Sequence, residues 1–504
     1  MITKQQIVTD LKRFARRHYE YLKRGRECSM HPLRIRKKQL DELHAVFEDR
    51  IAALAEEISE YRDSISDAPL SREKGTVLFE NFRILSYNGD SMGKVLGRDN
   101  CIYRGVYKES VPDFIRLWNS GLLQVLGRNG MIPVTTVTDY YTEEYPIILQ
   151  HEIVDMSTSK LWNSRMIKDA CVTMTVIDRV ARTAGFKLYD GHLNNMTFHN
   201  GKPVFTDIGS IVENRGQKTA YENGLVFAGL YRLLFSALNN SILKRVQPYD
   251  EENNAIWISR RFYDDATVEY YKALRKFKGY HSLRSSILCS WIIFRVFDCY
   301  DCRPEYIELL FGSNAQTAER QVCAAADIDC TVKAIKKLDL DAKTAVDIGG
   351  TSGELSCALY DRLGLKVISA EYDEGRAIEA YDRFRAQDVP VCSVLFNYLY
   401  GADDNTRDYI RSDIAIALDI THNLKAYQPW KPDSLLNSLS KMTNAYAAVT
   451  FHPDEENAGE AGARTSAEET ERFESVFAEF FSVLLKEEIK NGTRKGFLYV
   501  GKRK

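Results

Sequence analysis

The stretch Lys187–Ile211, KLYDGHLNNMTFHNGKPVFTDIGSI, decides the fold of the first half of the chain. Within it, Met196–Phe198 and Pro203–Thr206 are short apolar segments, and each is typical of a strand. The segment between them, His199–Lys202, contains Asn-Gly, which favours a tight hairpin turn. The sequence therefore predicts a β-hairpin here, and residues on either side of it come together at one edge.

Polar side chains flank this predicted hairpin. Asp190 and Asn195 stand five positions apart before it, and Asp207 follows it directly in the sequence Asp-Ile-Gly. A phosphoryl-transfer site needs one carboxylate near the attacking hydroxyl, and a carboxamide with a second carboxylate to hold Mg²⁺ on the nucleotide phosphates. The spacing meets that need. The alternative is a surface hairpin with ordinary turn residues and an acidic strand end.

A second signal lies in Thr344–Leu355, TAVDIGGTSGEL, which predicts a strand, a glycine-rich turn and the start of a helix. The next apolar strand, Lys366–Ala370, ends on Glu371. In Rossmann-type sheets, glycines let the backbone approach a ligand, and an acidic residue about 20 positions on binds the ribose hydroxyls. The turn is not GxGxxG, and with Asp347 before it the stretch resembles the first motif of class I methyltransferases, which bind S-adenosylmethionine (SAM). A βα turn with incidental glycines is the alternative.

Length, net charge and cysteine content limit the number of domains and the classes of function that the chain can have. A chain of 504 residues predicts two or three domains, and a formal net charge of −2 argues against a specific nucleic-acid partner. Ten cysteines include a single CxxC, Cys299–Cys302, for which a zinc site and two incidental helix cysteines are both open. Reduced cysteines without a signal peptide predict a cytoplasmic protein.

Residues 1–70 predict a helical segment whose first half is basic and whose second half is acidic. It is read either as a solvated helical hairpin or as a basic arm that makes a peripheral contact with the inner face of an anionic membrane or with an anionic glycan. Three further regions follow. Residues 75–312 predict an α+β two-lobe domain like that of protein kinases, 313–340 a helical linker, and 341–504 a doubly wound α/β, Rossmann-like domain.

Taken together, these pieces resemble a bacterial family of large SAM-dependent methyltransferases that includes the NoeA-type nodulation proteins. The matching stretches are Ile102–Arg104, Ser120–Leu122, Leu188–Asn195, Lys202–Asp207, Val346–Glu354 and Leu418–Leu424. The domain content is also similar to that of bacterial enzymes that end polysaccharide chains by adding phosphate and then methyl groups. The resemblance implies a glycan or glycan-phosphate acceptor.

If the kinase-like domain is active, Asp190 would orient or deprotonate the acceptor hydroxyl, while Asn195 and Asp207 would hold Mg²⁺. Arg104 is the candidate for the cation that binds the phosphates of ATP. Four features depart from the pattern of active kinases. The turn Asn88–Gly93, NGDSMG, is not GxGxxG, and Leu188 and Tyr189 replace the usual His-Arg before Asp190. Arginine replaces the usual lysine, and the predicted helix Ser110–Val125 offers no central glutamate to position it.

For the methyltransferase, the resemblance implies a set of SAM-binding residues: Asp347, Gly349, Gly350, Gly353, Glu371 and Asn397. Asp419 and His422 follow the fourth strand, where a base for a hydroxyl acceptor commonly stands in this fold, and His422 is equally well a packing residue. The sequence therefore predicts a SAM-dependent O-methyltransferase fused to a kinase-like domain that acts on a bacterial surface glycan or its phosphate. The alternatives are a methyltransferase whose kinase-like domain only recognises the acceptor or a partner, and a scaffold with two degenerate sites.

Overall fold

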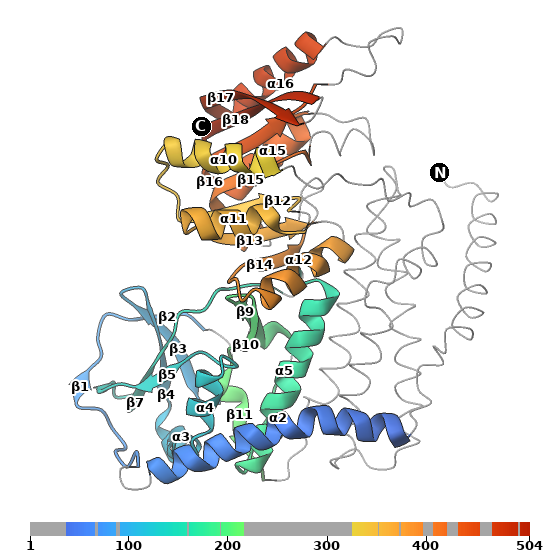
Figure 1. Cartoon of the computed structure of the whole chain (residues 1–504). Helices are drawn as coiled ribbons and strands as arrows, with labels where there is room; N and C mark the ends of the chain where they lie inside the picture. Colours follow the sequence, from blue (N-terminus) through green and yellow to red (C-terminus); the bar gives the residue numbers. More distant parts are fainter. Residues whose placement is uncertain are drawn as a thin grey trace, which may run out of the picture. The chain divides into compact units, whose positions relative to one another are not determined.

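The computed structural model describes residues 37–65, 69–86, 91–158, 161–191, 193–215, 325–350, 352–371, 374–396, 407–420, 432–453, 466–491 and 494–504. These residues fall into two compact units (Figure 1). The described residues up to 215 form the first unit, except for 161–165, which belong with the residues from 325 onward in the second. Each unit is described by itself.

The first unit contains a five-stranded antiparallel sheet in the order β2-β3-β4-β7-β5. Its strands are β2 (Arg83–Ile84), β3 (Gly93–Arg98), β4 (Cys101–Val106), β5 (Thr135–Val137) and β7 (Ile147–His151). Asp99 and Asn100 join β3 to β4 with φ of 50° and 59°, a left-handed turn that matches the twist of the two strands. β1 (Val77–Leu78) and β6 (Tyr140–Tyr141) form a separate parallel pair, and Tyr140 packs against the core of this sheet.

The prediction of one continuous helix over Ser110–Val125 is wrong. After the 3₁₀ turn η1 (Lys108–Ser110), the chain forms α3 (Val111–Asn119) and then α4 (Leu122–Arg128). Gly121 separates them with φ of +79°, a left-handed conformation that ends a right-handed helix. Apolar spacing continues through the break, since Phe114, Leu117 and Leu122 are all buried, so periodicity alone did not reveal it.

The predicted hairpin is confirmed. β9 (Met196–His199) and β10 (Lys202–Phe205) pair antiparallel, and His199 is opposite Lys202. The 3₁₀ turns η3 (Leu193–Asn195) and η4 (Ile208–Ser210) lie before and after it. The remaining elements of this unit are α2 (Lys37–Ser64), α5 (Ser164–Thr183) and the antiparallel pair β8 (Phe186–Leu188) and β11 (Ile211–Glu213).

The second unit is a seven-stranded sheet in the order β14-β13-β12-β15-β16-β18-β17. Its first five strands are parallel, and β17 and β18 form an antiparallel hairpin against β16. The strands are β12 (Thr344–Ile348), β13 (Lys366–Glu371), β14 (Cys392–Leu395), β15 (Ser412–Ala417), β16 (Thr443–Phe451), β17 (Phe481–Asn491) and β18 (Arg494–Arg503). The doubly wound α/β fold predicted for this region is confirmed.

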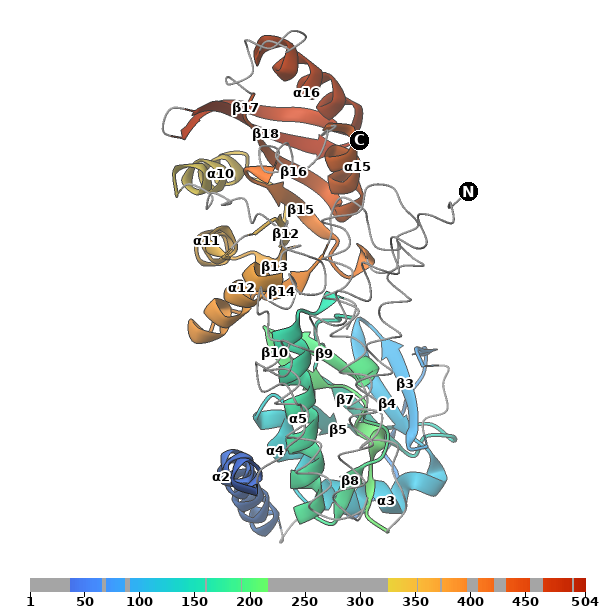
Figure 2. The same cartoon turned by 90° about the vertical axis from the view of Figure 1, so that its right-hand side faces the viewer.

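Helices cover both faces of this sheet (Figure 2). On one face lie α10 (Ala325–Lys337), α11 (Glu354–Leu363) and α12 (Glu374–Ala386), and on the other α15 (Pro432–Met442) and α16 (Ser466–Phe480). Alternate residues of β12 enter the two cores, Ala345 on the first face and Val346 on the second. A sheet buried on both faces explains why its central strands read as continuous apolar runs.

The linker predicted for residues 313–340 needs correction over its described part. Residues 325–337 form α10, and Ile328, Val332 and Ile335 on one side of this helix are buried against the sheet of the second unit. Apolar positions three and four apart make one stripe of the helix, which must be covered. This helix therefore belongs to the α/β unit.

Several predictions fall outside the described residues: the basic half of the N-terminal segment, the helices expected over 217–312, and the pair Cys299 and Cys302. Within the part of the chain that the structure describes, no helix combines the length and apolar character needed to cross a bilayer.

Candidate functional site

Parallel strands bring the ends of β13, β12, β15 and β16 to one edge of the second unit's sheet. Glu371 is the last residue of β13, and Asp347 is the last but one of β12. Asp419 follows β15 by two residues. In open α/β sheets, ligands bind at this carboxyl edge. Two of the predicted SAM-binding residues and one predicted catalytic residue therefore share the edge where a ligand is expected.

The glycine turn after β12 is built for close approach. A Cβ on Gly350 would stand 2.5 Å from Ser369 Oγ and 2.8 Å from Asp347 Oδ2, so only glycine fits there. Gly349 has φ of +69° and Gly353 has φ of +90°, both in the left-handed region that glycine adopts readily. The turn thus runs directly against the β12–β13 edge, and α11 begins one residue after Gly353.

Asp347 supports this turn from beneath. Ser356 Oγ donates a hydrogen bond of 2.7 Å to Asp347 Oδ2, and the carboxyl is buried. Burial is the main cause that raises the pKa of Asp347 to about 7. The charge of Glu371 acts in the same direction, and the hydrogen bond from Ser356 acts in the opposite one. The hydrogen-bonded carboxyl therefore ties the end of β12 to the first turn of α11.

Glu371 is 0% exposed, and its strand is paired on both sides. Any ligand that reaches its carboxyl must therefore displace the groups that now cover it. Asn397 and His422 lie outside the described residues. Glu354, which sequence reasoning did not single out, accepts hydrogen bonds from Ser352 and Arg383 at the start of α11.

Asp419 lies in an unusual backbone conformation, with φ of +54°, and its amide donates a 2.7 Å hydrogen bond to Thr450 Oγ1 on β16. His452, directly after β16, places Nε2 3.0 Å from Asp419 Oδ1. Asp327 of α10 completes a cluster in which one ligand-type atom from each residue lies within 4.8 Å of the others.

His452 and Asp327 were missed by sequence reasoning. His452 stands alone after an apolar strand, in the sequence Val-Thr-Phe-His-Pro, and no spacing motif marks it. Its position at a strand's carboxyl end was the one available signal. Asp327 comes from the helix that was read as a linker, and only the fold brings it to Asp419.

The first unit brings together the residues predicted to serve phosphoryl transfer. Asn195 Nδ2 donates a 2.9 Å hydrogen bond to the backbone oxygen of Asp190 and lies 3.4 Å from Asp207 Oδ2. The Asp190 side chain is exposed. The amide nitrogen of Asn195 faces Asp207, so the amide must turn over before its oxygen could coordinate a cation there. Ser210 Oγ also donates to Asp207 Oδ2.

Arg104 contacts the same carboxylate. It lies on β4, the third strand of the sheet, with 3% of its side chain exposed, and its Nη2 is 3.6 Å from Asp207 Oδ1. Burial lowers the pKa of Arg104, and Asp207 acts in the opposite direction. Burial and the nearby Arg104 charge together lower the pKa of His151 on β7 to about 3, so this imidazole is neutral.

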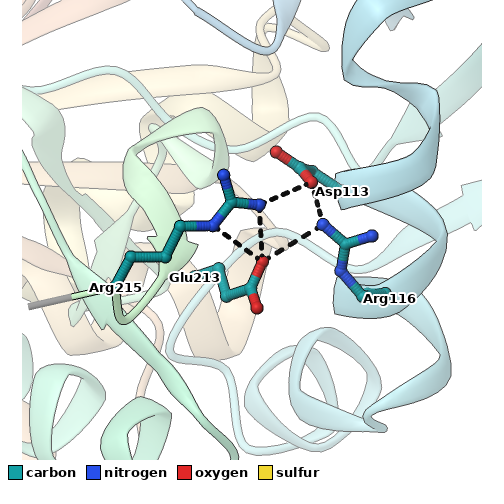
Figure 3. A network of polar contacts seen from close by, with 4 residues as sticks. All are labelled: Asp113, Arg116, Glu213 and Arg215. Atoms are coloured by element: carbon teal, nitrogen blue, oxygen red, sulfur yellow. Dashed lines mark hydrogen bonds and ion pairs between the residues drawn. The ribbon is translucent and has the colours of Figure 1, made fainter.

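Charged side chains of α3 pair with residues of β11 and of the segment after it (Figure 3). Arg116 of α3 donates a 3.1 Å hydrogen bond to Glu213, the last residue of β11. Arg215 donates to Glu213 at 2.7 Å and to Asp113 at 3.1 Å. Hydrogen bonds from Arg215 and Arg116 lower the pKa of Glu213. Two arginines and two carboxylates thus tie α3 to the segment that follows Asp207.

No protein-family model and no curated protein matches the chain. Solved structures that resemble part of it include the magnesium protoporphyrin IX methyltransferase ChlM from Synechocystis PCC 6803 with bound SAM, at 14% identity and a TM-score of 0.27, covering 35% of this chain and 78% of that one. The N-terminal domain of EvdMO1 with bound S-adenosylhomocysteine (SAH) has 15% identity and a TM-score of 0.28, covering 36% and 83%. TehB from Haemophilus influenzae has 15% identity and a TM-score of 0.27, covering 40% and 66%. The fold assignment rests on the strand order and register described above.

Proposed function

We propose that the second unit is a SAM-dependent O-methyltransferase. The observation that carries the proposal is the geometry of the β12–β13 edge. A glycine turn packs so closely that Gly350 excludes any side chain, and an acidic residue ends the adjacent strand. This combination suits a nucleoside whose ribose hydroxyls bind Glu371 while the rest of the ligand lies along the turn.

When bound, SAM supplies an electrophilic methyl group on a positively charged sulfur. The residues of this chain would then hold and orient the two reactants, since positioning supplies most of the catalysis of such a displacement. Gly349, Gly350 and Gly353 would allow close approach, and Glu371 would fix the ribose. A hydroxyl acceptor must also lose its proton, and Asp419 and His452 are the polar groups at the adjacent strand ends.

The acceptor belongs to the proposal as well. The resemblance to polysaccharide-terminating enzymes favours a bacterial surface glycan or its phosphate, and a kinase-like first unit would supply that phosphate from ATP and Mg²⁺. Two observations support this role of the first unit. Arg104 lies on the third strand of the sheet, and Asp190, Asn195 and Asp207 lie around the β9–β10 hairpin. Peripheral contact with the inner face of the cytoplasmic membrane, through the basic N-terminal residues, stays a proposal that follows from their charge.

A second candidate function has its own observation in its favour. Arg104 already neutralises the carboxylate that Mg²⁺ would need, and Asp113, the acidic residue of α3, pairs with Arg116 and Arg215. The first unit would then recognise the acceptor or a partner protein without transferring phosphate. Nucleotide binding separates the two candidates.

The methyltransferase proposal is tested by comparing Glu371→Gln with Glu379→Gln. Glu379 is exposed on α12 in the same unit, so it controls for the loss of a carboxylate. Calorimetric titration with SAH should give at least tenfold weaker binding for Glu371→Gln, because a charge-assisted hydrogen bond is worth about 1.5–3 kcal/mol. Unchanged binding in a folded Glu371→Gln protein would remove Glu371 from the site.

A further inference from the structure

We propose that Asp327, Asp419 and His452 bind a divalent metal ion at the carboxyl edge of the second unit. The first argument is geometric. Carboxylate and imidazole atoms from three separate elements, α10, the end of β15 and the end of β16, converge within 4.8 Å of one another. Two ligands of one ion, each at about 2.0–2.2 Å from it, are separated by on the order of 4 Å at most. The cluster is therefore close to the size that one ion requires.

The second argument is the state of these side chains. Asp327 and His452 are 1% and 3% exposed, yet Asp327 Oδ2 and Asp419 Oδ2 have no hydrogen-bond partner within the described ranges. His452 Nε2 lies 3.0 Å from Asp419 Oδ1, so the imidazole belongs to the same cluster. Buried polar atoms are nearly always paired, so unpaired carboxylate oxygens in such a cluster indicate that a ligand belongs there.

Charge gives the third argument. Two carboxylates lie in this buried cluster, and one imidazole can offset only one of them. Burial of like charges is costly unless a cation compensates for them. A divalent ion balances both carboxylates and leaves the imidazole neutral, which is the form that binds metals.

The surrounding chain holds the imidazole in place. A Cβ on Gly496 of β18 would lie 2.4 Å from His452 Nδ1, so the ring packs directly against the backbone of that strand. Asp419 is held by the hydrogen bond from its amide to Thr450, the residue two before His452. Fixed ligands on strand ends are what a metal site of defined geometry needs.

The ligand set indicates the class of ion. Imidazole suits Zn²⁺ and other transition metals, and carboxylate suits Mn²⁺ as well. Mg²⁺ prefers oxygen ligands and retains several waters. We therefore expect a divalent transition metal, Mn²⁺ or Zn²⁺, with three protein ligands and open positions for water and an acceptor oxygen. An acceptor hydroxyl bound there would release its proton to water more easily. That catalytic role rests on the proposed methyltransferase function, whereas binding of the ion does not.

The test measures metal binding directly, with no SAM present. The full chain carrying Asp207→Asn removes the carboxylate predicted to hold a metal in the first unit, and Mn²⁺ is titrated while the electron paramagnetic resonance signal of free Mn²⁺ is recorded. We expect one Mn²⁺ ion per chain. Adding Asp327→Asn or His452→Gln should weaken binding at least tenfold, whereas Asp329→Asn, an exposed carboxylate on the same helix, should leave it unchanged.

Gly496→Ala provides a variant that keeps all three ligands. Its methyl group should displace the His452 ring and weaken Mn²⁺ binding, while the melting temperature shows whether the protein still folds. Absence of binding by Mn²⁺, Co²⁺ and Zn²⁺ to the Asp207→Asn protein would overturn the proposal. Binding that both Asp327→Asn and His452→Gln leave unchanged would also overturn it. Metal binding without SAH binding would retain the site and refute the methyltransferase function instead.

Discussion

Arg104 Nη2 lies 3.6 Å from Asp207 Oδ1, so the buried cation of the third strand contacts the carboxylate assigned to metal binding. Mg²⁺ and Arg104 must therefore compete for Asp207. Nucleotide phosphates would resolve that competition, because Arg104 could then turn to the phosphates while the metal binds Asp207 and Asn195.

The first prediction concerns nucleotide binding by this unit. ATP with Mg²⁺ should raise the melting temperature, since a ligand selective for the native state stabilises it by mass action. Asp207→Ala should abolish the Mg²⁺-dependent part of the shift, and Glu109→Ala, an exposed acidic residue of the same unit, should retain it. If ATP does not change the melting temperature with any divalent ion, we would conclude that the first unit recognises the acceptor or a partner protein without transferring phosphate.

The second prediction separates phosphoryl transfer from nucleotide binding. Asp190 is exposed and contacts Asn195 through its backbone oxygen, so Asp190→Asn should leave Mg·ATP binding nearly unchanged. Loss of the carboxylate should lower phosphate transfer by about 10²-fold or more. Asn194→Ala, at an exposed neighbouring position, is the control. Equal rates for Asp190→Asn and the wild-type protein would exclude a catalytic role for Asp190.

Much of the first unit could be predicted because its signals are local. The turn Asn200-Gly201 and the apolar segments beside it specify the β9–β10 hairpin within ten residues. The break at Gly121 was missed because a single glycine costs a helix only about 1 kcal/mol, and the apolar spacing continues beyond it. The contact between Arg104 and Asp207 joins residues 103 positions apart, and nothing local encodes it.

The third prediction compares two glycines with similar backbone conformations. Gly353 and Gly364 have φ of +90° and +66°, so alanine at either position should cost about 1–2 kcal/mol. A Cβ on Gly353 would in addition lie 2.5 Å from Phe384 Cζ, whereas one on Gly364 would meet nothing within 4 Å. Overpacking adds about 1–3 kcal/mol.

Gly353→Ala should therefore lower the melting temperature more than Gly364→Ala, and only Gly353→Ala should weaken SAH binding. Thermal unfolding and calorimetry measure the two effects. Equal destabilisation by the two changes would show that Phe384 moves aside freely.

The fourth prediction is a pH dependence. The pKa of Asp347 is about 7 in the folded protein, above its ordinary value of 3.8. Between these values the folded state binds the extra proton, so the free energy of unfolding falls as pH rises from about 4 to 7. Asp347→Asn cannot ionise and should escape this loss, which is on the order of a few kcal/mol.

Between pH 5 and pH 8, the melting temperature of the wild-type protein should therefore fall relative to that of Asp347→Asn. Asp329→Asn provides the contrast, because hydrogen bonding to Arg362 lowers the pKa of Asp329 and the carboxyl is ionised in both states above pH 5. A constant difference for Asp347→Asn across this range would contradict an uncharged Asp347.

In the second unit, strand patterns and the glycine turn led to the fold and to the residues of the β12–β13 edge. The sequence did not reveal that Asp327 and His452 lie close to Asp419, because Asp327 and His452 are 125 positions apart and neither belongs to a motif. The apolar spacing in α10 fits a linker helix as well as a helix of the α/β unit, and only the folded structure shows that a sheet covers its apolar side.

The central claim is that the second unit binds SAM, and calorimetric titration of the wild-type chain with SAM and with SAH tests it most directly. The account predicts saturable binding of both ligands at one site per chain, with Glu371→Gln weakened and Glu379→Gln unchanged. Wild-type protein that is folded and binds neither SAM nor SAH would contradict the account.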